Sequence, residues 1–434
     1  MKTNKNLRSY IILWLTQSLS TLGSSMTGYA LVLWLYQGSG SALKAALLTV
    51  CSYAPYVVMS IFAGAVSDRL DKRKTMLVCD LAAATVTVTI LFLIKTGQLA
   101  PWHLYAANAV SGLMNTIQQP ASEAAVTLLV PREYYQKTNG MRSFSQALNT
   151  ILTPVLATAV FAFAGIEGVI AADLATFGAA FITLLFFIKI PEAPADKKAC
   201  QSLLSSAREG LGWLRENPLI LKLIMFLACI NLVASVYDAA LPAMLLSVKN
   251  GGERVLGAVN TCVGAASLIG SIIATVLPAP KNRVRAVCLS LFVSMSTENF
   301  LLAFGKTPVI WCIGAVLGWI VIPYMNANMD VIFRSEIPAE MQGRVYSCRN
   351  TLQFFTIPLG LFLGGILVDN VFEPLMAVQQ EDSVLSDIFG VGKGSGAALL
   401  FAVIGIAGVT VCLLFSMLLK DFFRDCGNED NGRL

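Results

Sequence analysis

The chain has 434 residues, of which 56% are hydrophobic and 13% are charged, whereas a soluble domain carries roughly 25% charged residues. This composition excludes an ordinary soluble enzyme or binding domain and predicts an integral membrane protein. The net charge of +5 reflects where Lys and Arg stand relative to the membrane, and it indicates no nucleic-acid partner.

Twelve apolar stretches are long enough to cross a membrane as helices, because about 20 residues span the ~30 Å hydrocarbon layer. In chain order they occupy residues 10–35, 43–66, 75–95, 102–128, 140–163, 167–189, 219–246, 255–278, 285–304, 308–333, 345–369 and 396–419. Six precede residue 190 and six follow residue 218. The sequence therefore predicts an all-α fold of two six-helix bundles, 1–190 and 219–434, with a cytoplasmic linker at 191–218.

The distribution of basic residues predicts the orientation of these helices. Residues 1–8 are polar and basic, and the apolar stretch that follows is too long for a signal-peptide core. With the N-terminus inside, all but six of the 31 Lys and Arg lie on the cytoplasmic side; the exceptions are Lys44, Lys95, Lys249, Arg254, Lys306 and Lys393. This bias predicts a multi-pass plasma-membrane protein with both termini in the cytoplasm.

The most specific motif, GAVSDRLDKRK at 64–74, joins spans two and three. A glycine permits close helix approach, an aspartate is favoured at a helix N-terminus, and an arginine can hold a carboxylate in a bidentate pair. The motif resembles the loop signature of the major facilitator superfamily. That resemblance assigns a cytoplasmic gate to Gly64, Asp68, Arg69, Arg73 and Lys74, with Glu123 of span four as the candidate partner of Arg69. A plain basic topology loop is the alternative.

Two further segments narrow the resemblance to one branch of this superfamily. LWLTQSLSTLG at 13–23 and GSGSA at 38–42 look like the macrolide-efflux branch, as do Pro55, Pro120, Pro131, Asn139 and the Gly343–Val345 run. The likeness implies export of a drug or metabolite.

The halves of the chain also repeat weakly. Counted from Pro131 and from Pro338, Arg142 and Arg349 both lie eleven residues on, and glutamines follow four residues later in each half. Two six-helix repeats are typical of transporters. In the linker, leucines at helical spacing between 203 and 214 predict a short amphipathic helix.

In superfamily members, spans one, four, seven and ten line a central cavity. Polar residues of these spans follow i, i+3/4, i+7 spacing, which places them on one helix face. The resulting cavity candidates are Gln17, Thr21, Ser24, Asn108, Asn115, Gln119, Asn231, Ser235, Trp319, Tyr324 and Asn326. Ordinary packing between membrane helices is the alternative.

Carboxylates within spans are candidates for proton coupling, because an isolated charge in lipid is expensive. Asp238 and Glu298 lie deepest, and Asp238 is preferred because it shares a face with cavity candidates, whereas span nine is usually peripheral in the family. Asp330 is the third candidate. Asp80, Asp173, Asp369 and Asp330 itself lie nearer predicted helix ends, where water or headgroups can solvate them. A structural hydrogen bond or salt bridge is the alternative for Asp238. The family's span-four Arg-x-x-x-Gly motif is absent, since 105–112 reads YAANAVSG.

Motifs of enzymes and cofactor sites are not found. The single histidine, His103, rules out an H-E-x-x-H zinc site, no G-x-S-x-G motif occurs, and the ten cysteines form no C-x-x-C pair. We expect no enzymatic activity, no cofactor and no bound metal.

Together these patterns predict a secondary active transporter, acting as a monomer among membrane lipids, that exports small amphipathic molecules such as macrolide-like drugs by alternating access, with protons moving the other way. A nutrient importer or symporter of the same fold is one alternative. A non-transporting membrane sensor or assembly partner is another.

Overall fold

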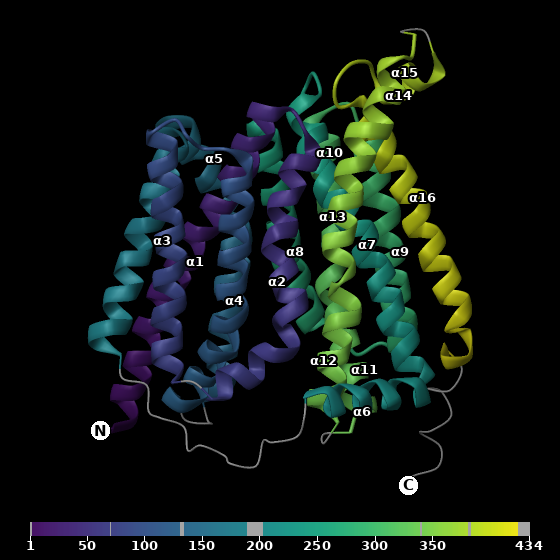
Figure 1. The fold of residues 1–434 in the computed structure, drawn as a ribbon. Coiled ribbons are helices and arrows are strands. Elements are labelled where there is room, and N and C mark those ends of the chain that lie inside the picture. Colours follow the sequence, from purple (N-terminus) through teal and green to yellow (C-terminus); the bar gives the residue numbers. More distant parts are fainter. Residues whose placement is uncertain are drawn as a thin grey trace. The chain divides into compact units, whose positions relative to one another are not determined.

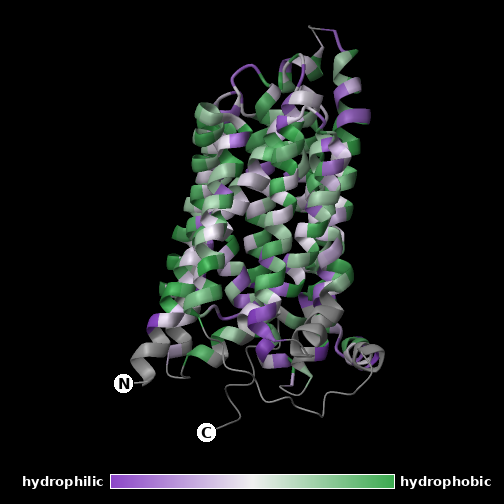
Figure 2. Cartoon of the chain, turned by 60° about the vertical axis from the view of Figure 1, so that its left-hand side comes forward, coloured by the Kyte–Doolittle hydropathy of each residue, from purple (hydrophilic) through white to green (hydrophobic). Residues whose placement is uncertain are grey.

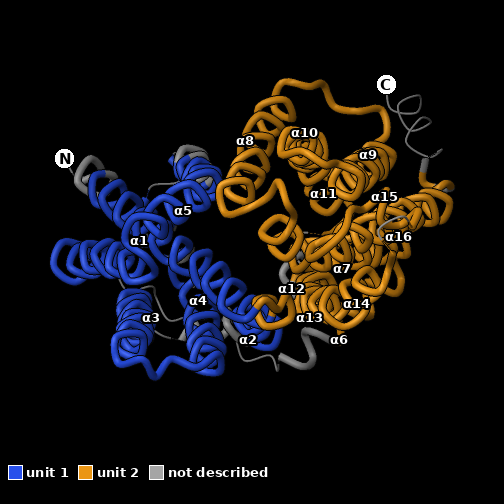
Figure 3. Tube along the Cα trace, turned by 90° about the horizontal axis from the view of Figure 1, so that it is seen from above, with its two compact units in different colours: residues 1–39, 47–203 blue, residues 40–46, 204–434 orange. Residues whose placement is uncertain are grey.

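A computed structural model describes residues 2–69, 71–130, 134–188, 203–338, 341–380 and 383–423. Within these ranges every element of regular structure is helical (Figure 1). Contacts divide the chain into two compact units, residues 1–39 with 47–203, and residues 40–46 with 204–434 (Figure 3). We call them unit 1 and unit 2.

Nine helical stretches in the described ranges are long and apolar enough to cross a membrane. Hydrophobic residues run along the bodies of the helices, and hydrophilic residues become more frequent toward the ends (Figure 2). The helices α1 and α4, with 38 and 29 residues, are also long enough to cross a membrane. One of the nine stretches, Phe144–Phe187, contains two helical segments that meet at a kink. The structure is thus consistent with twelve spans.

Unit 1 is built from the first five helices, apart from the first residues of α2, 42–46, which belong to unit 2. They are α1 (Lys2–Ser39), α2 (Ala42–Arg69), α3 (Lys72–Lys95), α4 (Pro101–Leu129) and α5 (Tyr135–Ile182), which continues into the π-helical turn η2 (Thr183–Phe187). Helix α5 covers two predicted spans, because the chain turns at Gly165, whose φ of 63° and ψ of −167° are not helical. Glycine adopts this conformation without the steric penalty that a Cβ atom would bring.

Among the described residues, the core of unit 1 includes two apolar clusters that α1 joins. One includes Met26, Ala30 and Leu35 of α1, and the other includes Tyr10 and Leu13. The polar stretch 17–21 lies between these clusters along the helix. Unit 1 therefore places hydrogen-bonding side chains between two apolar layers.

Unit 2 holds the remaining helices. They are α6 (Leu203–Glu216), α7 (Pro218–Ser247), α8 (Glu253–Val276), α9 (Arg283–Phe304), α10 (Pro308–Trp319), α11 (Ile322–Glu336), α12 (Gln342–Phe354), α13 (Thr356–Ile366), η3 (Leu367–Phe372), α14 (Glu373–Ala377), α15 (Val384–Phe389), α16 (Ser395–Leu418) and η4 (Lys420–Phe423). Two predicted spans are interrupted: 308–333 is divided between α10 and α11, and 345–369 between α12, α13 and η3.

Helix α7 is the central helix of unit 2, with more than half of its residues buried. The rings of Phe226 and Tyr237 pack against Phe415 and Phe401 of α16 at centroid distances of 5.0 and 5.3 Å. On its other side, Gly360 of α13 lies against Ser235, so close that an added Cβ would come 2.7 Å from the serine Cβ. Small residues allow such close approach between membrane helices.

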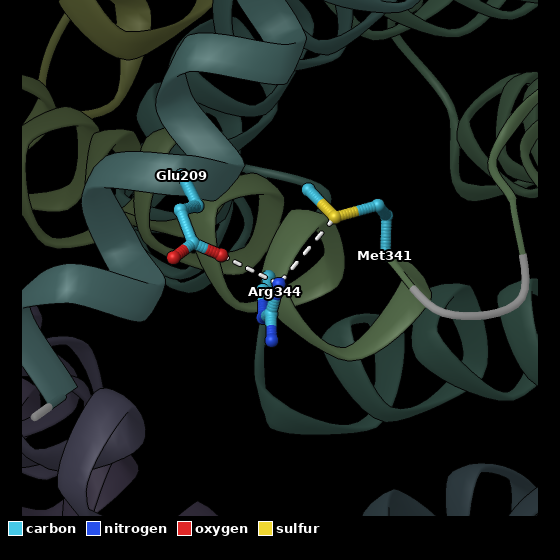
Figure 4. Close-up of polar contacts among 3 residues, drawn as sticks. All are labelled: Glu209, Met341 and Arg344. Atoms are coloured by element: carbon cyan, nitrogen blue, oxygen red, sulfur yellow. Dashed lines mark hydrogen bonds and ion pairs between the residues drawn. The ribbon is translucent and has the colours of Figure 1, made fainter. Parts of the chain in front are cut away.

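Helix α6, within the expected linker, packs against α12. A Cβ on Gly210 would lie 2.8 Å from the Arg344 carbonyl oxygen. The Glu209 carboxylate forms an ion pair with the Arg344 guanidinium at 2.5 Å, and the same guanidinium reaches the sulfur of Met341 (Figure 4). Leu214 is buried, while Leu211 is 38% exposed. Among the described residues, a buried leucine, a close backbone approach and an ion pair therefore fix the position of this helix.

The first turn of α2 belongs to unit 2, and a carboxylate of the same unit caps it. The Asp369 carboxylate accepts hydrogen bonds from the Ser41 hydroxyl at 2.5 Å and from the backbone N–H groups of Ala42 and Leu43, each at 2.9 Å. A carboxylate at a helix N-terminus satisfies backbone donors that have no partner within the helix, and the helix dipole attracts it. These contacts explain why residues 40–46 belong to unit 2 while the rest of α2 belongs to unit 1.

Candidate functional site

The predicted gate residues divide into two groups. The side chains of Asp68, Arg69 and Glu123 lie outside the described residues, as do the surroundings of Gly64. Arg73 is described, and its guanidinium donates to the carbonyl oxygens of Leu184 and Leu185 at 3.2 and 2.5 Å. A cation at the C-terminal end of a helix satisfies carbonyls that have no helical partner. Lys74 is exposed and donates its backbone N–H to Asp71.

A polar cavity of about 370 Å³ lies between α1, α4 and α5 of unit 1. Three of the predicted cavity residues, Gln17, Thr21 and Gln119, line it. The other lining residues are Tyr10, Leu13, Trp14, Ser18, Ser122, Val126, Arg142, Ser145, Gln146 and Asn149. The wall thus combines amides, hydroxyls and the guanidinium of Arg142 with an apolar and aromatic side.

A second cavity of about 330 Å³ lies between α2 and α4. Asn115 and Gln119 line it together with Tyr53 and Tyr56. Gln119 therefore belongs to the walls of both cavities. Between them these spaces bring together four of the six cavity candidates from spans one and four.

Two buried carboxylates of unit 1 hold side chains of α1. Asp80 of α3, 9% exposed, accepts from Gln118 Nε2 at 2.6 Å and from Gln17 Nε2 at 3.4 Å. Asp173 of α5, 4% exposed, accepts from the Ser24 hydroxyl at 2.9 Å. The expectation that water or headgroups solvate these aspartates is wrong, because neighbouring helices enclose them. Ser24, a predicted cavity residue, is bonded to one of them.

Unit 2 encloses Glu298 between α9 and α10. Its side chain is 4% exposed, and its Oε1 accepts the indole N–H of Trp319 at 2.8 Å. Gly318 leaves room for it, since a Cβ there would lie 2.6 Å from the glutamate Cβ. Span nine, expected to be peripheral, thus carries an enclosed carboxylate bonded to a predicted cavity residue.

The other two proton-coupling candidates have exposed side chains. Asp238 of α7 and Asp330 of α11 are both exposed. Asp238 is near enough for its charge to act on Glu298, and Asp330 acts likewise on Arg349. The preceding residue, Tyr237, has a buried hydroxyl that lies beside Glu298. The structure therefore groups Glu298, Trp319, Tyr237 and Asp238 in one cluster.

The remaining cavity candidates make separate contacts. Asn108 donates to the Leu104 carbonyl of its own helix. Asn231 donates to the Gln353 carbonyl of α12 at 3.2 Å. Ser235 is buried against α13, Tyr324 is half-buried and Asn326 is exposed on α11. Among the described side chains, no group of three or more His, Cys, Asp or Glu could hold a metal ion.

A long helical chain with enclosed carboxylates in its spans and a polar cavity is typical of membrane transporters. The model of the Major Facilitator Superfamily matches residues 13–361. The chain belongs to this superfamily, and it is accordingly a multi-pass membrane transporter and not an enzyme.

Curated relatives include efflux proteins. Macrolide efflux protein A of Streptococcus pyogenes is 24% identical over 372 residues, which cover 85% of this chain and 91% of the relative. The multidrug efflux pump Tap of Mycolicibacterium fortuitum is 22% identical and covers 80% of this chain and 86% of the relative. Among solved structures, a bacterial homologue of the iron transporter ferroportin in its inward-facing state superposes with a TM-score of 0.66 at 16% identity, covering 95% of this chain and 98% of the other. That likeness shows a shared fold alone.

Proposed function

We propose that this transporter, as a monomer in the plasma membrane, exports small amphipathic compounds by alternating access in exchange for protons. The names of the efflux relatives support the direction and the substrate class. The mixed wall of the unit 1 cavity supports an amphipathic substrate, because its aromatic side suits an apolar body and its amides and hydroxyls suit a polar edge.

Proton coupling rests on one observation, the enclosed carboxylate of Glu298. Burying a charge without a counter-charge is costly, so a carboxyl group in such a site binds or releases a proton when its surroundings change. The indole of Trp319 stabilises the ionised form by donating to it. Rotation or withdrawal of this indole would favour protonation, which links the proton to movement of a predicted cavity residue. Asp238 and Asp330 are the further carboxylates that we propose for proton coupling.

The gate is proposed on the cytoplasmic side. Gly64, Asp68, Arg69, Arg73 and Lys74, with Glu123 as partner of Arg69, would latch the cytoplasmic ends of the helices while substrate leaves on the other side. The bond from Arg73 to the carbonyls after α5 supports an anchoring role for this loop.

The test uses protein reconstituted in vesicles that contain a pH-sensitive dye. A pH gradient is imposed, macrolides and other amphipathic drugs are added, and proton flux is compared between wild type, Glu298→Gln and Asp238→Asn. We expect drug-dependent flux in the wild type and its loss in Glu298→Gln. Unchanged flux in Glu298→Gln would exclude this carboxylate, and proton and drug movement in the same direction would favour a symporter instead.

A further inference from the structure

Gln17 is shared between a buried carboxylate and the polar cavity of unit 1. Its Nε2 donates to Oδ2 of Asp80 at 3.4 Å, and the same side chain lines the cavity. The other carboxylate oxygen, Oδ1, accepts the much shorter bond from Gln118 at 2.6 Å. Each oxygen of Asp80 therefore has its own amide partner, and the partner that faces the cavity makes the longer bond.

A primary amide has a donor end and an acceptor end. While the NH₂ end of Gln17 is directed at an ionised Asp80, the carbonyl Oε1 is the end that remains for a ligand. A proton added to Asp80 goes to Oδ2, because the competing hydrogen bond there is the longer and weaker one. The carboxyl O–H then requires an acceptor, which Gln17 supplies once its amide has turned by about 180°.

We propose that Asp80 and Gln17 form a proton-controlled switch that sets whether the cavity offers an acceptor or a donor to its ligand. With Asp80 ionised, Gln17 presents Oε1 and binds a ligand through an N–H or O–H group. With Asp80 protonated, Gln17 presents NH₂ and this bond is lost. Binding of such a ligand releases one proton from Oδ2 to water, as exchange requires. The inference rests on the proposed function and names its substrate class, amphipathic compounds that carry a hydrogen-bond donor.

Among the described residues, few other charged or titratable groups surround this switch. Cys79 is its neighbour on α3, and α4 contributes the neutral Gln118. From α1 and α5, Tyr10 and Arg142 line the cavity; Glu123 of α4 has its side chain outside the described residues. Asp80 is therefore the group that we assign to the titration.

Asp173 provides a matched control. It is also a buried aspartate of unit 1, and it also holds a residue of α1, Ser24, seven positions after Gln17. A hydroxyl both donates and accepts by rotating its own hydrogen, so protonation of Asp173 can reverse its bond with Ser24 without turning a side chain. Neither residue lines the polar cavity.

The experiment measures equilibrium binding to the purified full-length protein between pH 5 and 9. The probes are a radiolabelled macrolide, whose hydroxyls donate, and tetraphenylphosphonium, an amphipathic cation without N–H or O–H groups. We expect the wild type to bind the macrolide about tenfold more tightly at the alkaline end, which corresponds to one hydrogen bond. Two variants should bind the macrolide weakly at every pH. They are Asp80→Asn, which mimics the protonated state, and Gln17→Met, which retains the size of the side chain. Asp173→Asn should keep the wild-type pH dependence of macrolide binding. The affinity for tetraphenylphosphonium should be the same in Gln17→Met as in the wild type.

Macrolide affinity that does not change with pH in the wild type would overturn the switch, as would an unaltered pH dependence in Asp80→Asn. Macrolide counterflow in vesicles without a pH gradient measures transport separately. Counterflow with pH-independent binding would leave the proposed export intact and remove only the switch. Binding that depends on pH without counterflow would support the switch and contradict the proposed export.

Discussion

Trp319 donates its indole N–H to Oε1 of Glu298 over 2.8 Å and so joins α10 to α9. Eight residues earlier on α10, Trp311 donates its indole N–H to the Gly305 carbonyl oxygen over 2.9 Å. The two bonds have nearly the same length, but one acceptor is a carboxylate and the other is a backbone carbonyl. The two tryptophans therefore separate the effect of the carboxylate from the effect of losing an indole.

Replacing Trp319 with Phe should remove the donor that Glu298 accepts while keeping an aromatic ring in place. A hydrogen bond to a charged group contributes about 1.5–3 kcal/mol, so drug-dependent proton flux in vesicles should fall about tenfold or more. Trp311→Phe should lower thermal stability and leave the flux close to that of the wild type. Equal losses of flux in the two variants would argue against a special role for the bond to Glu298.

Gly318→Ala should disturb the same carboxylate through steric contact. An added Cβ would lie 2.7 Å from Oε2 of Glu298, and overpacking of this kind costs about 1–3 kcal/mol. Thermal unfolding in detergent should show a lower midpoint. The matched variant is Gly178→Ala in α5, where an added Cβ meets nothing within 4 Å, and its midpoint should stay the same or rise. A stable Gly318→Ala protein would mean that the glutamate moves aside freely.

Gly165→Ala tests the turn between the two arms of α5. A backbone with φ of 63° and ψ of −167° is strained for any residue with a Cβ, at about 1–3 kcal/mol. We expect a lower unfolding midpoint than for Gly28→Ala, which also adds a methyl group in open space. A midpoint equal to that of the control would show that the turn adopts another backbone conformation.

The ion pair between Glu209 and Arg344 should contribute little to stability. The two side chains are 49% and 33% exposed, and exposed pairs contribute about 0–1 kcal/mol. A double-mutant cycle with Glu209→Gln and Arg344→Gln should give a coupling free energy within that range, decreasing as salt is added. A larger value would indicate that α6 depends on this pair for its position against α12.

Most helices could be predicted from hydropathy, because a membrane helix must fill the apolar layer with apolar side chains. The predicted stretches 219–246 and 285–304 fall within α7 and α9. The break between α10 and α11 could not be predicted in this way, because hydropathy stays high across it.

The carboxylate environments were harder to predict, because they depend on contacts between helices distant in sequence. Asp80 is enclosed by α1 and α4, whose amides lie 63 and 38 positions away. Glu298 is enclosed because Gly318, twenty residues on, leaves space for it. Each of these residues is visible in the sequence as a polar or small residue within a span, but its partner is fixed only by packing.

The cap that Asp369 places on α2 has a consequence for dividing the chain. Hydropathy suggests that the chain can be divided into two fragments within the linker, between the sixth and seventh spans. A fragment that starts at residue 204 would contain Asp369 without Ser41, Ala42 and Leu43, the three groups that it accepts from. The seven residues 40–46 would remain on the other fragment, although they pack with the second. Functional complementation between two such fragments would therefore depend on this short segment docking again beside Asp369.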